Sequence, residues 1–149
     1  MRIHLQDAVV DAISVEPTGV PQNGVRPIGR VSGPEEALPI IFTLDAIGWT
    51  ELLYTANGVR DRKASDWDDV GFNYPSDISE PDEEPFDGVE VHNPIFEVIV
   101  SEKAFDRLMA RFFRVLVIGA GAARDPVITT DWWPSFLTIV KDLEKRGGS

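Results

Sequence analysis

The residues of this chain that can carry chemistry are mostly carboxylates, and they are crowded into one segment. Residues 66–90 read DWDDVGFNYPSDISEPDEEPFDGVE, and no Lys or Arg lies between Lys63 and Lys103. The ten acids of the segment carry a formal charge of −10, against −11 for the whole chain. The acidity is therefore local. The acids are Asp66, Asp68, Asp69, Asp77, Glu80, Asp82, Glu83, Glu84, Asp87 and Glu90.

Large apolar side chains are interleaved with these acids: Trp67, Phe72, Tyr74, Ile78 and Phe86. Solvating acidic tails contain few aromatics, whereas protein interfaces are enriched in them. In binding to a basic partner, the acids would steer the association and the rings would become buried in the interface. A solvated loop with its aromatics packed on the core, and metal chelation, are the alternatives. We predict a partner-binding surface made of Asp66, Trp67, Asp68, Asp69, Phe72, Tyr74, Asp77, Glu80, Asp82, Glu83, Glu84, Phe86, Asp87 and Glu90.

Part of the acidic segment has the spacing of a calcium loop. Asp66, Asp68, Gly71 and Asp77 fall at positions 1, 3, 6 and 12 of an EF-hand loop. Position 5 would be Val70, which has no side-chain oxygen, and position 12 lacks the bidentate Glu. Prolines within and after the stretch do not fit paired helices. We predict no metal site and no cofactor.

Two other features, a glycine-containing segment and the two histidines, could belong to a cofactor site or a catalytic site, but their sequence context does not fit either. Residues 115–121 (VLVIGAG) resemble the opening of a dinucleotide-binding fold, but Arg124 takes the place of the third glycine and Pro126 falls inside the required helix. A helix end, or a strand followed by a turn, is the simpler interpretation. The two histidines, His4 and His92, lie in no recognisable nucleophile arrangement. We therefore predict no catalytic residue and no enzymatic activity.

The elements of the N-terminal half follow from composition and periodicity. Residues 2–15 are rich in β-branched side chains, which favours a strand over a helix. Five prolines and four glycines between 17 and 39 predict a long surface loop. The apolar run 39–44 (PIIFTL) predicts a strand. Residues 49–55 fit a second strand or a helix that Asp45 caps and Asn57-Gly58 ends.

The C-terminal half gives clearer signals. Residues 95–100 predict a buried strand that begins after Pro94. Ser101 is placed to cap a helix, and a second helix begins near Thr130, with Pro134 in its first turn and Gly147 at its end. The first helix carries one apolar stripe, formed by Phe105, Leu108, Met109, Phe112 and Leu116.

Length and composition fix the class. With strands early, helices late and no regular β-α-β alternation, 149 residues predict a single α+β domain over 1–149. We expect an antiparallel or mixed sheet with two C-terminal helices packed on it, a Pro/Gly-rich loop at 17–39 and an acidic loop at 66–90. The absence of cysteine excludes a disulfide scaffold, a thiolate zinc site and a cysteine nucleophile.

The charge also bears on partners. The chain has 25 acidic and 14 basic residues, and a protein with this net negative charge is repelled by phosphate backbones and anionic lipids. We therefore predict no nucleic-acid and no membrane partner. No window approaches 18 uncharged apolar residues, and acids interrupt the start of the chain where a secretory signal needs an apolar stretch. We predict a cytoplasmic protein.

Three features together support a resemblance to a known class of proteins. They are the small size of the chain, the acidic-aromatic stretch from Asp66 to Phe86, and the strand-to-helix passage VIVSEKAFDRLMARF (98–112). In these features the chain resembles the small acidic immunity proteins that bacteria co-produce with polymorphic or contact-dependent toxins. The resemblance implies a non-enzymatic inhibitor that binds a cognate basic toxin of the nuclease type and occludes its active site with carboxylates in place of phosphates. No functional residue is carried over by motif. A small metal-dependent hydrolase and a phage or accessory structural subunit are the alternatives, and the oligomeric state stays open.

Overall fold

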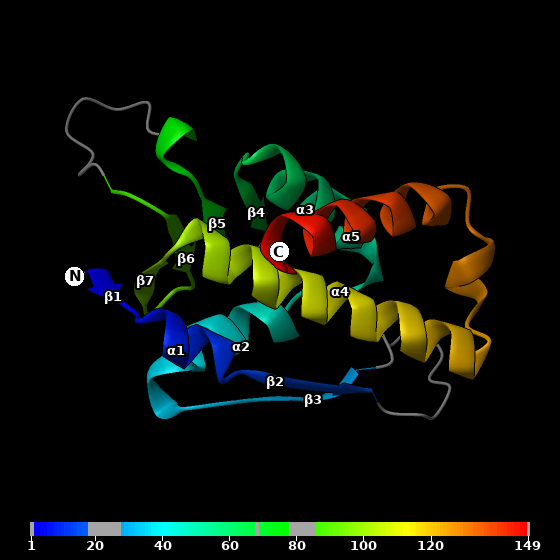
Figure 1. Cartoon of the computed structure of the whole chain (residues 1–149), viewed down its shortest axis with the longest axis horizontal. Coiled ribbons are helices and arrows are strands. Elements are labelled where there is room, and N and C mark those ends of the chain that lie inside the picture. Colours follow the sequence, from blue (N-terminus) through cyan, green and yellow to red (C-terminus); the bar gives the residue numbers. More distant parts are fainter. Residues whose placement is uncertain (1, 18–27, 68, 78–85, 149) are drawn as a thin grey trace.

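The computed structural model describes residues 2–17, 28–67, 69–77 and 86–148, which form a five-stranded sheet, a two-stranded ribbon and helices packed on both (Figure 1). The first strand of the sheet runs parallel to its neighbour, and the other neighbouring pairs are antiparallel. The sheet is therefore mixed. Its strands, in spatial order, are β1 (Arg2–His4), β7 (Glu97–Val100), β6 (Val89–His92), β5 (Val70–Asn73) and β4 (Ser65–Trp67).

Two antiparallel helices, α4 (Glu102–Ala123) and α5 (Trp133–Gly148), pack along each other through the middle of the molecule (Figure 1). The Ser101 hydroxyl accepts the Ala104 N–H at 3.1 Å, which confirms Ser101 as the N-cap of α4. The predicted stripe of α4 is buried along its whole length. These helices on a mixed sheet confirm the predicted α+β class. Helix α4 extends through the VLVIGAG segment, so no strand occurs there.

The N-terminal half contains more helix than the sequence predicts. The run 39–44 lies in helix α2 (Leu38–Asp45), so its prediction as a strand is wrong, and residues 49–55 belong to helix α3 (Trp49–Asp61). Helix α3 begins after Gly48 and continues past Asn57-Gly58 to a left-handed Arg62, so neither predicted end of this helix is correct.

The prediction of one strand over 2–15 is also corrected, because α1 (Asp7–Asp11) separates β1 from β2 (Ser14–Pro17). Part of the predicted loop 17–39 is ordered structure as well. Strand β3 (Ile28–Ser32) pairs with β2 to form a ribbon that lies against α4 (Figure 1). The short helices η1 (Glu35–Ala37), η2 (Pro75–Asp77) and η3 (Pro126–Thr129) complete the described elements.

None of the described helices is by itself long and apolar enough to cross a bilayer. One pair, Glu35–Asp45 with Trp49–Asp61, reaches that length and composition only when its two members are taken together across a bend of 117°.

Candidate protein-binding surface

The structure separates the fourteen residues of the predicted binding surface into three groups. Six of them have side chains outside the described residues: Asp68, Asp77, Glu80, Asp82, Glu83 and Glu84. Phe72, Tyr74 and Glu90 are buried. The remaining five are exposed or partly exposed: Asp66, Trp67, Asp69, Phe86 and Asp87.

Three of these residues lie inside the fold and not on its surface. The Phe72 ring lies edge-on to that of Phe105, with centroids 4.9 Å apart, between the sheet and α4. Burial raises the pKa of the Tyr74 hydroxyl far above its usual value, so Tyr74 is a neutral core residue. The Glu90 carboxylate accepts a hydrogen bond from the Asn73 amide at 3.2 Å. All three side chains are packed in the interior of this fold.

Trp67 has a structural role at the edge of the sheet. Its indole N–H donates to the carbonyl of Ala46 at 3.2 Å, and its ring packs edge-on against Phe72. Because Ala46 follows the last residue of α2, this contact ties β4 to the end of that helix. The exposed acids Asp66 and Asp69 on either side of it therefore have a defined position.

The register places a set of polar side chains on the outer face of the sheet. Asp66, Gly71 and His92 lie side by side on β4, β5 and β6, and His92 Nε2 approaches Asp66 Oδ1 to 3.1 Å across the middle strand. Gly71 makes this possible, because a Cβ there would lie 2.6 Å from Asp66 Oδ1. Asn73 Nδ2 lies 3.3 Å from His92 Nδ1. We call these residues, together with Glu90, the polar sheet face.

The polar sheet face orients the ring of His92. Both of its ring nitrogens contact side chains of the protein, Asp66 on one side and Asn73 on the other. Among the side chains that the structure describes, no group of three or more His, Asp or Glu is arranged to hold a metal ion.

A second feature, which the sequence did not predict, is an apolar groove of about 380 Å³ between α2 and the turn that joins β6 to β7. Leu38, Ile41, Phe42 and Asp45 follow one another at i, i+3, i+4 and i+7, and so share one face of α2. We call the following residues the apolar groove: Leu38, Pro39, Ile41, Phe42, Asp45, Asn93, Pro94, Ile95 and Phe96.

The β6–β7 turn is held in place by one buried side chain. The Oδ1 atom of Asn93 accepts the backbone N–H groups of Ile95 and Phe96 at 2.9 and 3.0 Å. Its Nδ2 atom donates to the carbonyl of Pro39 at 3.4 Å, and its backbone N–H donates to the Phe96 carbonyl. Asn93 thus folds the turn and fastens it to α2.

This turn and helix hold large apolar side chains in solvent. The exposed fractions are 77% for Ile95, 57% for Phe42, 52% for Leu38 and 46% for Phe96. Single exposed apolar residues are normal on a protein surface, but a cluster in one groove is typical of a binding site. No protein-family model, curated protein or solved structure matches this chain. The groove is therefore interpreted from its own chemistry.

The basic residues are segregated from the groove. The stretches 31–59 and 64–102 contain no Lys or Arg, and they supply α2, most of α3, and strands β4 to β7. Contacts of α2 with β6 and β7, and of α3 with β4, bring the two stretches together. We call the part of the molecule that they build the cation-free side; Arg2 on β1, which pairs with β7, and Arg62, which contacts Glu102, lie at its border.

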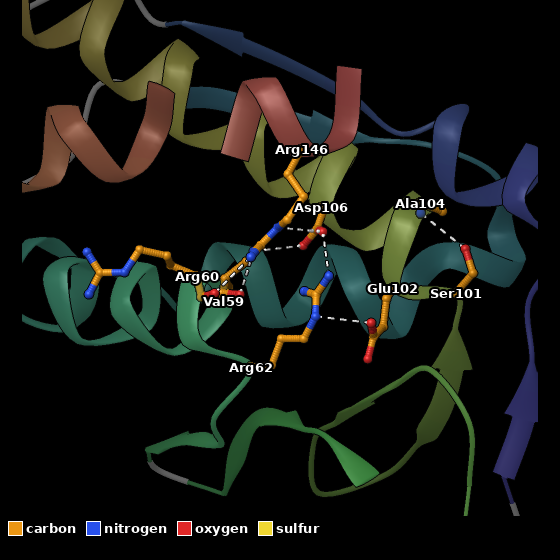
Figure 2. A network of polar contacts seen from close by, with 8 residues as sticks. All are labelled: Val59, Arg60, Arg62, Ser101, Glu102, Ala104, Asp106 and Arg146. Carbon is orange, nitrogen blue, oxygen red and sulfur yellow. Dashed lines mark hydrogen bonds and ion pairs between the residues drawn. The ribbon is translucent and has the colours of Figure 1, made fainter. Parts of the chain in front are cut away.

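Five arginines elsewhere in the described part of the chain are paired with the chain's own carboxylates. Arg146 and Arg62 converge on the buried Asp106, with Arg146 Nε 3.0 Å and Arg62 Nη2 3.5 Å from Oδ2 (Figure 2). Other pairs are Arg60–Asp61, Arg62–Glu102, Arg107–Asp11 and Arg114–Glu144. All of these carboxylates lie outside the segment 66–90, so these arginines do not neutralise it.

The arginines that lie in a row on α4 are engaged in contacts within the protein. Arg107, Arg111 and Arg114 line a hollow of about 720 Å³ beside β2. Arg111 donates to the carbonyls of Ile13 and Val10, and burial lowers the pKa of its guanidinium. The hydrogen bond from Arg114 lowers the pKa of the Glu144 carboxyl. The row therefore holds α1 and α5 against α4 and fixes Ile13, which lies just before the ribbon.

Replacing Asn93 tests whether the turn depends on it. Asn93→Ala removes the acceptor of two N–H groups and the donor to Pro39, so we expect a loss of about 1–2 kcal/mol in the free energy of unfolding. We also expect faster amide hydrogen exchange at residues 95 and 96. Asn93→Asp keeps the Oδ1 acceptor and should preserve the slow exchange. Equal exchange in all three proteins would show that the side chain does not hold the turn.

Proposed function

We propose that this protein is a non-enzymatic inhibitor that binds a basic partner protein, in the manner of an immunity protein bound to its toxin. The observation that carries the proposal is the segregation of charge. All fourteen basic residues lie outside the two stretches that build the cation-free side. The described ion pairs of the arginines consume carboxylates outside the segment 66–90.

Charge segregation of this kind supports recognition of a cationic surface. A face that carries charge of one sign attracts an oppositely charged partner over a distance of about one Debye length, which is about 8 Å at physiological salt. Asp66, Asp69 and Asp87 are exposed on this side of the molecule. A nuclease-type toxin presents Lys and Arg where it holds phosphates, and carboxylates placed there would exclude the nucleic acid.

Capture and reconstitution test the proposal. The whole chain, immobilised at low salt, is used to capture proteins from a lysate of its host, and each captured protein is then produced alone and together with the chain. We expect a basic protein that arrests growth when produced alone and forms a salt-sensitive complex with the chain that restores growth. A partner that is acidic, or that leaves growth unaffected on its own, would overturn the proposal.

Charge-neutral variants locate the contact. One variant neutralises three exposed acids of the cation-free side: Asp66→Asn, Asp69→Asn and Asp87→Asn. The matched control changes the net charge equally at exposed acids elsewhere: Glu16→Gln, Asp131→Asn and Asp142→Asn. We expect the first variant to lower the association rate with the captured partner about tenfold at low salt, because rim charges act on the rate of encounter. Equal rates for the two variants, measured by stopped-flow fluorescence, would remove this side as the contact surface.

A further inference from the structure

We propose that the apolar groove is the anchoring site for the partner and that it receives a short amphipathic helix whose apolar face is flanked by Lys or Arg. This inference rests on the proposed function and adds to it the place and the chemistry of the contact. Three features support it: the composition of α2, the construction of the turn and the charges around the groove.

Helix α2 is apolar on both of its sides. Ile40, Leu44 and Pro39 are buried in the core, while Leu38 and Phe42 on the other face are more than half exposed. A helix that is apolar all round is normally covered on all sides. Part of the outer face of α2 is covered by the 93–96 turn, and the groove is the part that the described residues leave open. An additional element that supplies apolar side chains would complete the packing.

The turn is built to receive such an element without rearrangement. Asn93 fixes the backbone of Ile95 and Phe96 and fastens it to Pro39 on α2, so both walls of the groove are positioned before anything binds. Ordering loops and side chains on binding costs free energy, and a preorganised surface avoids much of that cost. Ile95, the most exposed of the large apolar residues of the groove, is presented at its rim.

The charges around the groove select the occupant. The exposed Glu35 and Glu36 precede Leu38 at one end of the outer face of α2, and Asp45 lies at the other end. An α-helix of eight residues is about 12 Å long, so acids stand at both ends of an apolar strip of roughly two turns. Helices that bind in such grooves present apolar residues at i, i+3 or i+4, and i+7. Lys or Arg at both ends of that helix would meet these acids. A second copy of the chain would instead bring like charges together.

A designed peptide tests this chemistry directly. The probe is a synthetic peptide with Leu, Phe and Leu at i, i+4 and i+7 and a pair of Lys at each end. One control peptide has the same residues in scrambled order, and the other has Glu in place of each Lys. We expect the probe to bind the whole chain at least about tenfold more tightly than either control, by fluorescence anisotropy. Amide chemical shifts should change around residues 38–45 and 93–97.

Substitutions in the groove provide the decisive comparison. Ile95→Ser and Phe42→Ser remove exposed apolar groups, and Ile118→Ser removes a similarly exposed group, 56% accessible, from α4 outside the groove. We expect the two groove variants to weaken binding of the probe about tenfold and the α4 variant to change it less than about twofold. Circular dichroism and urea midpoints should stay close to wild type for all three, because the residues are exposed.

Three outcomes would overturn the inference. The first is that the groove variants and the α4 variant weaken binding of the probe equally, and the second is that the scrambled peptide binds as tightly as the probe. The third is a wild-type dimer in analytical ultracentrifugation that Ile95→Ser dissociates, which would assign the groove to a second copy of the chain. The proposed function fails separately. If the captured partner is basic and inhibited, yet binds Ile95→Ser as tightly as wild type, the function stands and the groove assignment falls. If the probe binds in the groove but the captured partner is not basic, the proposed function falls and the groove remains a site for a basic amphipathic helix.

Discussion

Asp106→Ala is expected to lower the free energy of unfolding by about 3 kcal/mol. The side chain of Asp106 is only 3% exposed, and its Oδ2 atom lies 3.0 Å from Arg146 Nε and 3.5 Å from Arg62 Nη2 (Figure 2). Removing the carboxylate leaves two guanidinium groups facing each other without their shared anion. Both arginines are about one third exposed, so water compensates in part, and the loss falls at the lower end of the range for buried pairs.

An exposed ion pair provides the control for this prediction. Asp61→Ala removes the partner of Arg60 at the surface of α3, and we expect a loss below about 1 kcal/mol because both groups stay hydrated. Asp106→Asn, which keeps the shape and one acceptor oxygen, should fall between the two. Urea unfolding followed by tryptophan fluorescence measures all three. Similar losses for Asp106→Ala and Asp61→Ala would show that the buried carboxylate does not organise this part of the fold.

Phe105→Ala is expected to destabilise the protein by about 3–5 kcal/mol. Phe105 is fully buried on α4, and its ring packs against Phe72 of β5, so the substitution opens a cavity between the longest helix and the sheet. The measurement is again the free energy of unfolding in urea.

Phe96→Ala is the matched variant on the surface. Phe96 is 46% exposed in the apolar groove, so we expect its truncation to cost less than about 1 kcal/mol of stability. If the groove anchors the partner, the same truncation should weaken binding clearly. Two phenylalanines would then be separated by function, one needed for folding and one for recognition. A loss of stability for Phe96→Ala as large as that for Phe105→Ala would mean that the groove belongs to the core.

The sequence predicts the C-terminal helices well, because their signals are local. The predicted buried strand over 95–100 is too long, because β7 begins at Glu97 and both Ile95 and Phe96 are exposed in the preceding turn. The stripe of α4 repeats with helical spacing over three turns, and Ser101 precedes it as a cap, so periodicity and capping agree. Helix α2 gave the opposite result. Its run PIIFTL is apolar on every side, and such a run has no period that distinguishes a buried strand from a helix. The apolar character of α2 on every side made the strand prediction wrong, and it also places apolar side chains such as Leu38 and Phe42 on the exposed face of the helix.

The binding surface was less accessible to sequence analysis. In β5, Val70 and Phe72 alternate with Gly71, and this period of two was the signal that Phe72 faces the core. The apolar groove has no local signal, because its two walls lie far apart in the chain and come together only in the fold, where Asn93 donates to the carbonyl of Pro39. The acidic segment shows where carboxylates concentrate in the sequence, but it carries no signal for the groove.

The parallel pairing of β1 with β7 also affects the order of events during translation. Arg2 pairs with Glu97, so the first strand leaves the ribosome long before its neighbour exists. At about 5–20 residues per second, β1 waits for several seconds or more without a partner. Completion of this edge of the sheet is therefore a late step in biogenesis.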